Sequence, residues 1–428
     1  MSTQYRVKHY TTYPARGGAG IAALRLVRGL CRRGHRATLI GLAGEEAVPE
    51  IRSIVYSRSP LANIRRRVRS GQISRIPDGY AGLSRQGAAF FTDRSAHGVA
   101  MADTFAGADI LHFHWVADLI DYADTLSRLP AGIPVVWTLH DMGAFTGGCT
   151  YSLGCEGFLS GCEDCPQLLE SGARAEARRS FKRREDAVSR NLENLTIVTP
   201  SAWLGAEAGR SRMLGGYPRE VIHNGYDLGL FKPERRAAGR SRIGAGENEV
   251  VLLFAAASVD NPVKGMNFLL EVLPPLEKKY AGLRVAYVGN CHPDSFPSRW
   301  QWLGSHSDES VLAEIYAGAD LLLLPSLADN FPNVIGEALS AGTPVAGSRV
   351  GGVPEMIVHG ETGFHLEPRD VSCWSRCLSR FIEYTPGQAE AMRNACRRYA
   401  EESLSLEASV SRHEELYRRV CRARTDRS

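Results

Sequence analysis

Residues 319–363 read ADLLLLPSLADNFPNVIGEALSAGTPVAGSRVGGVPEMIVHGETG. The stretch opens on a short apolar run, Leu321–Leu324, which Pro325 ends, and a second run follows at residues 343–346. Short apolar runs that are separated by helices are typical of parallel strands covered on both faces. The stretch therefore predicts part of an α/β domain with a parallel sheet.

Similar runs extend in both directions and form two successive series of strands and helices. The first series has expected strands at 5–12, 36–42, 109–115, 133–139, 195–199 and 220–223, and the second at 250–256, 283–288, 321–324 and 343–346. A stretch with Gly, Asp and Pro between Asn224 and Pro233 separates them. We expect domains at residues 1–225 and 226–405, followed by a helix at 406–428.

The length and composition agree with two soluble domains. A chain of 428 residues is too long for one ordinary core, and 44% hydrophobic and 23% charged residues exclude disordered and fibrous classes. Basic residues interrupt any early apolar run, and no run approaches the roughly 18 apolar residues of a membrane span. We expect a cytoplasmic protein, whose ten cysteines are then thiols or metal ligands more readily than disulfides.

The net charge of +4 is unevenly distributed along the chain. Residues 1–230 contain 28 Lys and Arg against 22 Asp and Glu, whereas residues 231–428 contain 23 against 25. The basic excess includes two runs, at 65–69 and 178–184. These are either solvated helix faces or a surface for anionic lipid or a phosphorylated acceptor. No nucleic-acid-binding motif accompanies them, so nucleic acid is not an expected partner.

Several residues with useful chemistry follow predicted strands, at the edge where ligands of open α/β sheets bind. Gly17, Gly18 and Gly20 open a helix after the first strand, where glycines either approach a phosphate or only form the turn. His140 and Asp141 end a later strand. His140 is either a hydrogen-bonding or acid–base residue or a buried structural histidine.

Three further side chains have the same double interpretation. His112 and His114 alternate with Phe113 along a strand, so both should point to one face. Lys264 follows the strand at 250–256 and is placed either to neutralise a diphosphate or to lie exposed in a loop.

Four of the ten cysteines lie within one glycine-rich segment of 17 residues. They are Cys149, Cys155, Cys162 and Cys165, in the pattern C-x5-C-x6-C-x2-C. The last spacing is that of a metal knuckle, and four thiolates satisfy tetrahedral zinc. A structural zinc ion, two disulfides and free thiols in a packed loop all remain open, but a four-cysteine site leaves no coordination position for catalysis.

The stretch at 319–363 resembles the retaining glycosyltransferases of family 4, and in particular the branch with colanic-acid and other exopolysaccharide transferases. The matching residues are Pro325-Ser326, Asp329, Glu337-Ala338, Gly342, Pro344-Val345, residues 351–355 and residues 360–363. Further matches lie at residues 17–20, His140-Asp141, residues 145–167, residues 224–227 and Lys264-Gly265. The resemblance implies the GT-B fold, in which two Rossmann-like domains face each other across a cleft. It also implies that the helix at 406–428 packs back on the first domain.

The resemblance places the donor site mainly in the second domain. Glu337 should bind the ribose hydroxyls of a nucleotide sugar, Asp329 should lie near the sugar, and Lys264 should hold the diphosphate. The other expected donor contacts are Asn330, Phe331, Pro332, Asn333 and Val334 at a helix N-terminus, Gly18 and Gly20 from the first domain, and Ser258, where many members have an arginine. The residues expected to be catalytic are His140, Lys264 and Asp329.

The acceptor side is assigned to the first domain. His114, Asp141, Phe145 and Tyr151 are expected there, with the two aromatic rings available for sugar stacking. The implied activity is retaining transfer from a nucleotide-diphosphate sugar to a glycan or lipid-linked hydroxyl, with no cofactor for catalysis and with peripheral contact to an anionic membrane. A sugar-nucleotide epimerase of the same fold and a non-catalytic homologue that binds nucleotide or glycan remain as alternatives.

Overall fold

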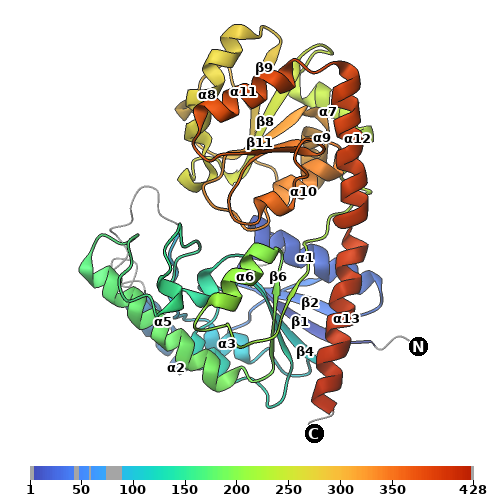
Figure 1. Ribbon diagram of the computed structural model, residues 1–428. Coiled ribbons are helices and arrows are strands. Elements are labelled where there is room, and N and C mark those ends of the chain that lie inside the picture. The colour runs from blue at the N-terminus through green and yellow to red at the C-terminus, as the bar shows by residue number, and fades with distance from the viewer. Residues whose placement is uncertain (1–3, 43–47, 57–58, 74–88, 426–428) are drawn as a thin grey trace. The chain divides into compact units, whose positions relative to one another are not determined.

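The computed structural model describes residues 4–42, 48–56, 59–73 and 89–425. They divide into two compact units, unit 1 with residues 1–223 and 409–428, and unit 2 with residues 224–408. Each unit is built on one parallel β-sheet with helices around it (Figure 1). The predicted α/β class with two parallel sheets is therefore confirmed.

Unit 1 has the strand order β3-β2-β1-β4-β5-β6-β7, and all its paired strands are parallel. Its strands are β1 (Arg6–Tyr10), β2 (Arg36–Gly41), β3 (Ile51–Ser53), β4 (Ile110–Phe113), β5 (Val135–Thr138), β6 (Leu195–Thr199) and β7 (Arg219–Val221). Its helices are α1 (Gly17–Arg32), α2 (Pro60–Ile73), α3 (Gly98–Ala102), α4 (Tyr122–Leu126), α5 (Ser171–Asn191), α6 (Ala202–Arg210) and most of α13 (Leu406–Thr425). The order reverses between β1 and β4, which makes the carboxyl ends of these strands the expected ligand-binding edge.

Unit 2 has the strand order β10-β9-β8-β11-β12-β13, again parallel throughout. Its strands are β8 (Val250–Ser258), β9 (Leu283–Asn290), β10 (Gln301–Trp302), β11 (Leu321–Leu324), β12 (Val345–Ser348) and β13 (Gly363–Leu366). Its helices are α7 (Arg236–Ile243), α8 (Met266–Lys279), α9 (Glu309–Gly318), α10 (Asn333–Ser340), α11 (Val371–Ile382) and α12 (Pro386–Ser403). The order here reverses between β8 and β11, so the edge at their carboxyl ends is the corresponding site.

The central strands are apolar because helices cover both of their faces. All four leucines of β11 are buried, and they belong to one core that unit 2 forms on its own. Unit 1 has a separate core around Phe113, Trp137 and Ile197. Each unit therefore buries its own apolar surface, as an independent domain does.

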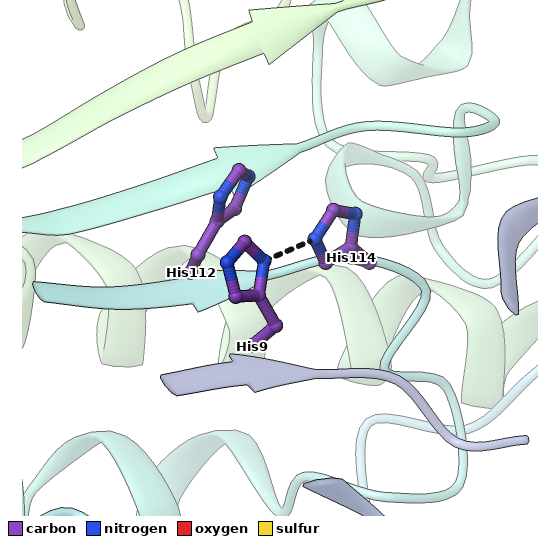
Figure 2. Close-up of side chains that lie close together, drawn as sticks. All are labelled: His9, His112 and His114. Carbon is purple, nitrogen blue, oxygen red and sulfur yellow. Dashed lines mark hydrogen bonds between the residues drawn. The ribbon is translucent and has the colours of Figure 1, made fainter. Parts of the chain in front are cut away.

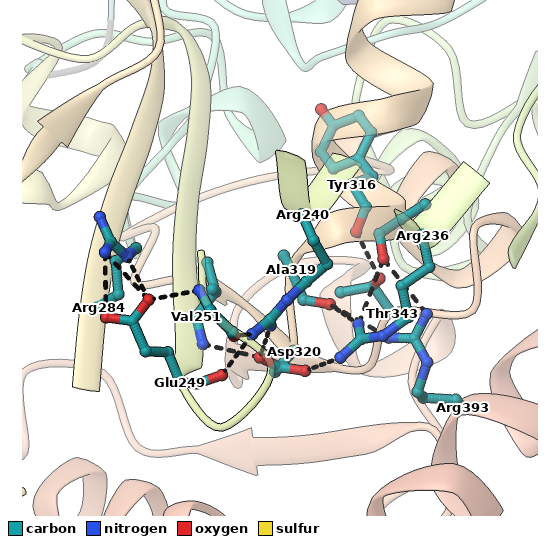
Figure 3. Close-up of polar contacts among 12 residues, drawn as sticks. Arg236, Arg240, Glu249, Val251, Arg284, Tyr316, Ala319, Asp320, Thr343 and Arg393 are labelled. Carbon is teal, nitrogen blue, oxygen red and sulfur yellow. Dashed lines mark hydrogen bonds and ion pairs between the residues drawn. The ribbon is translucent and has the colours of Figure 1, made fainter. Parts of the chain in front are cut away.

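A polar network closes the amino-terminal edge of the second sheet (Figure 3). The Asp320 carboxylate accepts hydrogen bonds from Arg236 at 2.5 Å, from Arg240 at 2.9 Å and from the backbone N–H of Val251 at 2.8 Å. Arg393 donates to the carbonyl of Ala319 at 3.1 Å, and burial lowers the pKa of its guanidinium to about 10. The starts of β8 and β11 are thus tied to α7 and α12.

Helix α13 packs in unit 1 although it follows all of unit 2 in the sequence. Its buried face includes Val410, Leu416 and Tyr417, and the Tyr417 hydroxyl lies 2.7 Å from Nδ1 of His112 on β4. At the surface, Glu414 pairs with Arg33 at the end of α1. The side of the first sheet that carries His112 is therefore covered only when this last helix is in place.

Candidate functional site

The strand switch point of unit 2 brings Lys264 and Asp329 together. Lys264 ends the 3-10 turn Pro262–Lys264 after β8, and Asp329 lies in the loop between β11 and α10. The ammonium Nζ of Lys264 is 2.6 Å from Oδ2 of Asp329, and the hydroxyl of Ser326 lies 3.3 Å from the same oxygen. A cation is thus held at the edge where open α/β sheets generally bind ligands.

Close backbone packing fixes the position of Lys264. The next residue, Gly265, has φ of +79°, and a Cβ at this position would lie 2.1 Å from the carbonyl oxygen of Pro325. Only glycine permits this approach, because any side chain would collide with the backbone of the facing loop. The turns after β8 and β11 therefore pack directly against each other.

Several predicted donor residues lie on helix α10 or just before it. Pro332 precedes its first turn, Asn330 and Phe331 are buried before it, and Glu337 is buried within it with 4% of its surface exposed. The buried ring of Tyr226 packs against Gly336 of the helix. A Cβ on Gly336 would lie 2.2 Å from this ring. The helix is therefore held close to the segment that begins unit 2.

The other predicted donor contacts lie around this edge. Asn333 opens α10, and its side-chain oxygen accepts a hydrogen bond from Asn224 at 3.2 Å. Val334 is half-buried on the first turn, and Ser258 is exposed at the end of β8. Unit 2 thus places Ser258, Lys264, Asp329 and the start of α10 around the carboxyl ends of β8 and β11.

The switch point of unit 1 contains the second group of predicted residues. A cavity of about 30 Å³ lies there, and His114, Trp115, Tyr122, His140 and Asp141 are among its lining residues. Asp141 accepts hydrogen bonds from Trp115 Nε1 at 2.9 Å and from the N–H of Gly143 at 2.7 Å. Burial nevertheless raises the pKa of the Asp141 carboxyl to about 6. The cavity therefore combines aromatic walls with one carboxyl group that titrates near neutral pH.

The prediction that Phe145 stacks on a sugar is wrong. Its ring is fully buried and packs edge-on against Phe158, because the short helical turn at 143–145 turns it into the core of unit 1. Tyr151 is half-buried, and its carbonyl accepts a hydrogen bond from Gln167 at 3.0 Å. Within the described part of the chain, neither residue lines the cavity beside His140.

The glycines in the first turn of α1 have a local structural reason. A Cβ on Gly20 would lie 2.2 Å from the carbonyl oxygen of Tyr13, so the first turn of the helix packs on the preceding loop. Gly18 is exposed on the same turn. Donor contact by Gly18 and Gly20 stays a prediction.

A chain of histidines leads from the cavity into the sheet, and its innermost member, His9, was not identified from the sequence. His140 Nε2 lies 3.2 Å from His114 Nδ1. On the other side of that ring, His114 Nε2 lies 3.0 Å from His9 Nδ1, as Figure 2 shows. One ring nitrogen each from His9, His112 and His114 lies within 4.8 Å of the other two, which is close enough to share a metal ion. Both nitrogens of His112 already bond hydroxyl groups, at 2.7 Å each, whereas Nε2 of His9 is buried without a hydrogen-bond partner among the described residues.

The basic run at 178–184 is only partly solvated. Arg184 has 2% of its surface exposed and donates to the carbonyls of Gly143, Thr146 and Phe91 at 2.5, 3.1 and 2.7 Å. Arg183 pairs with Asp93 at 2.7 Å. These two arginines tie α5 to the loops around the cavity and add little to a cationic surface.

Comparison with known proteins identifies the family. The model described as "Glycosyltransferase Family 4" matches residues 16–230, and the model described as "Glycosyl transferases group 1" matches residues 249–383. The chain belongs to glycosyltransferase family 4. The first match begins after β1 and includes β4, and the second includes β8 and β11 at the strand switch point of unit 2.

Named relatives and solved structures agree with the family 4 assignment. A D-inositol 3-phosphate glycosyltransferase of a Nocardioides species is 26% identical over 64% of this chain, and the chain spans 60% of that relative's length. Sucrose-phosphate synthase from Thermosynechococcus elongatus superposes with a TM-score of 0.65 at 18% identity, over 97% of this chain and 99% of the other. Anabaena HepE, solved with UDP-glucose, gives 0.64 at 16% identity, over 96% and 99%. The predicted GT-B fold is confirmed.

The buried histidines of this family 4 chain make the stability of unit 1 depend on pH. Burial lowers the pKa of His9 to about 3 and those of His140 and His413 to about 4, and it also lowers those of His112 and His114. Because unfolded histidine titrates near pH 6.5, the unfolded chain binds more protons between about pH 6.5 and 4. The stability is present above pH 6.5 and is lost as the pH falls. Each histidine contributes up to about 1.4 kcal/mol per pH unit.

We expect His413→Gln to reduce the slope of the unfolding free energy against pH between pH 6.5 and 4. The reduction should be about 1.4 kcal/mol per pH unit, which corresponds to one proton fewer taken up on unfolding. Asp141 opposes this slope, because a folded pKa raised to about 6 makes stability fall as the pH rises from about 4 to 6. Urea unfolding at a series of pH values measures the slope. The exposed His292→Gln is the matched control and should keep the slope of the unmodified chain. Equal slopes for both variants would show that the buried histidines do not control acid stability.

Proposed function

We propose that the chain is a retaining, metal-independent glycosyltransferase that moves a sugar from a nucleotide-diphosphate sugar to a hydroxyl of a glycan, in exopolysaccharide or related synthesis. The observation that carries the proposal is the pairing of Lys264 with Asp329 in front of α10. Family 4 membership supports the transfer chemistry, and the resemblance described above supports retention of configuration.

The chemistry of transfer accounts for the residues at the switch point of unit 2. The leaving diphosphate gains negative charge as the glycosidic bond breaks, and Lys264 with the first N–H groups of α10 would stabilise that charge. Asp329 would accept hydrogen bonds from donor-sugar hydroxyls while it holds the Lys264 side chain. The buried Glu337 carboxylate, one helical turn further, would bind the ribose hydroxyls.

The cavity of unit 1 favours an uncharged acceptor. Its aromatic residues suit the apolar faces of a sugar ring, and the Asp141 carboxyl suits a sugar hydroxyl. Arg184 also lines it, but two nitrogens of its guanidinium already serve three backbone carbonyls. That arrangement supports a glycan hydroxyl over a phosphorylated polyol such as the inositol phosphate named for the relative.

Product analysis tests the proposal. The purified chain is incubated with radiolabelled UDP-, GDP- and ADP-sugars, each with a neutral oligosaccharide or with D-inositol 3-phosphate, with no divalent cation added. Label in a larger neutral product supports the proposal, and the anomeric coupling of that product by NMR tests retention. An epimerised nucleotide sugar, or binding without turnover, would reject transfer, and label only on the inositol phosphate would reject the glycan acceptor.

The donor base is found by thermal unfolding in the presence of nucleoside diphosphates. A ligand present at 100 times its dissociation constant stabilises the folded chain by about 2.7 kcal/mol. We expect one of UDP, GDP and ADP to raise the unfolding temperature well above the others.

We also propose that α2 touches anionic membrane. Leu61, Ile64 and Val68 are 70%, 56% and 55% exposed at helical spacing, and Arg65 and Arg67 are exposed beside them. Apolar residues flanked by arginines are typical of helices that lie in the membrane interface. Among helices of the described ranges, none is long and apolar enough to cross a bilayer.

Co-sedimentation with vesicles tests this contact. Binding to vesicles that contain anionic lipid should fall as salt rises, and Arg65→Glu with Arg67→Glu should abolish it. The double charge reversal Arg412→Glu with Arg418→Glu, on the exposed face of α13, is the matched control and should reduce binding much less. Equal binding to neutral and anionic vesicles would reject the contact.

A further inference from the structure

Four cysteines of unit 1 surround one small cavity away from the proposed transfer site. Cys149, Cys155, Cys162 and Cys165 all line it, and its volume is about 20 Å³. All four are free thiols in the structure. We propose that these four cysteines bind one structural zinc ion.

Backbone N–H groups point at two of the four sulfur atoms. Gly157 donates to Sγ of Cys155 at 3.3 Å, and Gly147 donates to Sγ of Cys162 at 3.2 Å. A neutral thiol is only a weak acceptor, whereas a thiolate that binds a metal is a strong one. The donors are therefore arranged for thiolates.

A metal ion binds cysteine as the thiolate, because the ligand sulfur loses its proton on binding. Zinc suits four sulfur ligands in tetrahedral geometry, with Zn–S distances of about 2.3 Å.

The cavity has room for one ion between the sulfurs. Among the described residues, His9, His112 and His114 are the only group of three or more possible metal ligands whose donor atoms all lie within 4.8 Å of one another. No three of the four sulfurs are this close, so the sulfurs are spread more widely around their cavity. A Cβ on Gly157 would lie 3.3 Å from the sulfur of Cys155 and 3.8 Å from that of Cys162. The space between these sulfurs is thus kept open by a glycine, and rotation of the cysteine side chains into it completes the site.

The loop itself needs a cross-link. Leu153 and Cys162 have φ of +50° and +55°, in the left-handed region that disfavours side chains, and Gly148, Gly154 and Gly161 also have positive φ. The segment is rich in glycine and buries few apolar side chains, so hydrophobic burial contributes little to its order. One ion bound by four thiolates would hold both halves of the segment in place.

The segment that carries the four cysteines, residues 149–165, connects to the cavity beside His140 through one arginine. Arg184 donates to the carbonyls of Thr146 and Gly143, and the Thr146 hydroxyl donates to the carbonyl of Cys149 at 2.7 Å. Removal of zinc should therefore loosen the residues around that cavity while leaving unit 2 unchanged. The zinc proposal does not depend on the proposed transferase activity, because metal content is measured directly.

Metal analysis of the full chain, purified under reducing conditions and reconstituted with Zn²⁺, tests the proposal. We expect one zinc per chain, and cobalt substitution should give sulfur-to-cobalt charge-transfer bands typical of four thiolate ligands. Cys162→Ser and Cys165→Ser should each lose the metal. Cys396→Ser, a buried cysteine of unit 2, and the double variant Cys373→Ser with Cys377→Ser should keep it.

Thiol titration separates the alternatives, and it needs no variant to fold. The unreduced chain in denaturant with chelator should show ten reactive thiols, whereas two disulfides among these four cysteines would leave six. Six thiols with no bound metal would overturn the proposal in favour of an oxidised loop. Ten thiols with less than a tenth of a zinc per chain after reconstitution would overturn it in favour of free thiols.

Discussion

Lys264→Ala is expected to lower turnover by about 10²–10³-fold while it weakens binding of the nucleoside diphosphate by a much smaller factor. The ammonium group lies 2.6 Å from Asp329 at the ends of β8 and β11, where the proposed donor would place its diphosphate. The negative charge on that group is larger in the transition state than in the bound donor. An interaction that strengthens along the reaction coordinate affects turnover more than ground-state binding.

Two comparisons make this expectation specific. Lys264→Arg keeps the charge and should retain more activity than the alanine variant. Lys279→Ala removes an exposed lysine of α8, which pairs with Glu383 at the surface, and should leave both parameters unchanged. Calorimetric titration with nucleoside diphosphate gives the affinity, and initial rates give turnover. Equal losses of affinity and turnover would show that Lys264 only binds the donor.

The same substitution leaves the Asp329 carboxylate, which is almost buried, without its cationic partner. The unfolding temperature of each variant must therefore be measured beside its kinetics. The double variant Lys264→Ala with Asp329→Asn removes the unpaired charge, and it should regain stability without regaining turnover. Recovery of turnover in the double variant would reject a direct role for Lys264.

Asp320→Ala is expected to destabilise unit 2 by about 3 kcal/mol. Its carboxylate joins Arg236, Arg240 and the N–H of Val251, and it has 16% of its side chain exposed. Alanine would leave two arginines without their anionic partner and a strand donor without its acceptor. Urea unfolding measures the loss, and hydrogen exchange at the start of β8 shows where it occurs.

Conservative and distant variants test the origin of that loss. Asp320→Asn keeps an oxygen for Val251 but removes the charge, so it should be less destabilising than alanine. Glu367 pairs with Arg349 at the surface, where their side chains are 59% and 60% exposed. Glu367→Ala breaks this pair and should change stability little. A loss for Glu367→Ala as large as that for Asp320→Ala would contradict the assignment to the buried network.

The sequence predicted central strands well but missed three of the four edge strands, and it placed the fourth, β7, at 220–223. β6 and β11 have the bounds that were expected from their apolar runs, because strands in the middle of a parallel sheet are covered on both faces. β3 and β10 have three and two residues and lie at sheet edges, where they bury too little to leave a pattern. β13 was missed because it begins at Gly363, which reads as a turn. A Cβ there would lie 2.0 Å from the carbonyl oxygen of Val345 on the neighbouring strand.

The site could be predicted only where a local pattern carried it. His112 and His114 were expected on one face of their strand, and their rings stack with centroids 4.3 Å apart. The contacts of these histidines with His9 and Tyr417 join positions 105 and 305 residues apart, and no local pattern reports such separations. Tertiary packing alone brings these groups together.

Arg184 illustrates a signal that was present but not used. Its neighbours on the buried face of α5 are Ala177, Phe181 and Val188, at helical spacing from it. The spacing places Arg184 in line with apolar residues, while its charge suggests a solvated position. Helical periodicity was the better guide here, because backbone carbonyls of two loops accept hydrogen bonds from both terminal nitrogens of the guanidinium.

The course of α13 has a consequence for how this chain matures on the ribosome. Unit 2 is one continuous segment and can fold as soon as residue 408 has left the exit tunnel, whereas unit 1 lacks α13 until later. At about 5–20 residues per second, the segment between residues 223 and 409 takes about 10–40 s to synthesise. During that interval the nascent first sheet exposes the side of His112 that Tyr417 later covers. Unit 1 can therefore be completed only after all of unit 2 has been synthesised, and a nascent chain stalled before residue 409 would leave the surface under α13 open to chaperones.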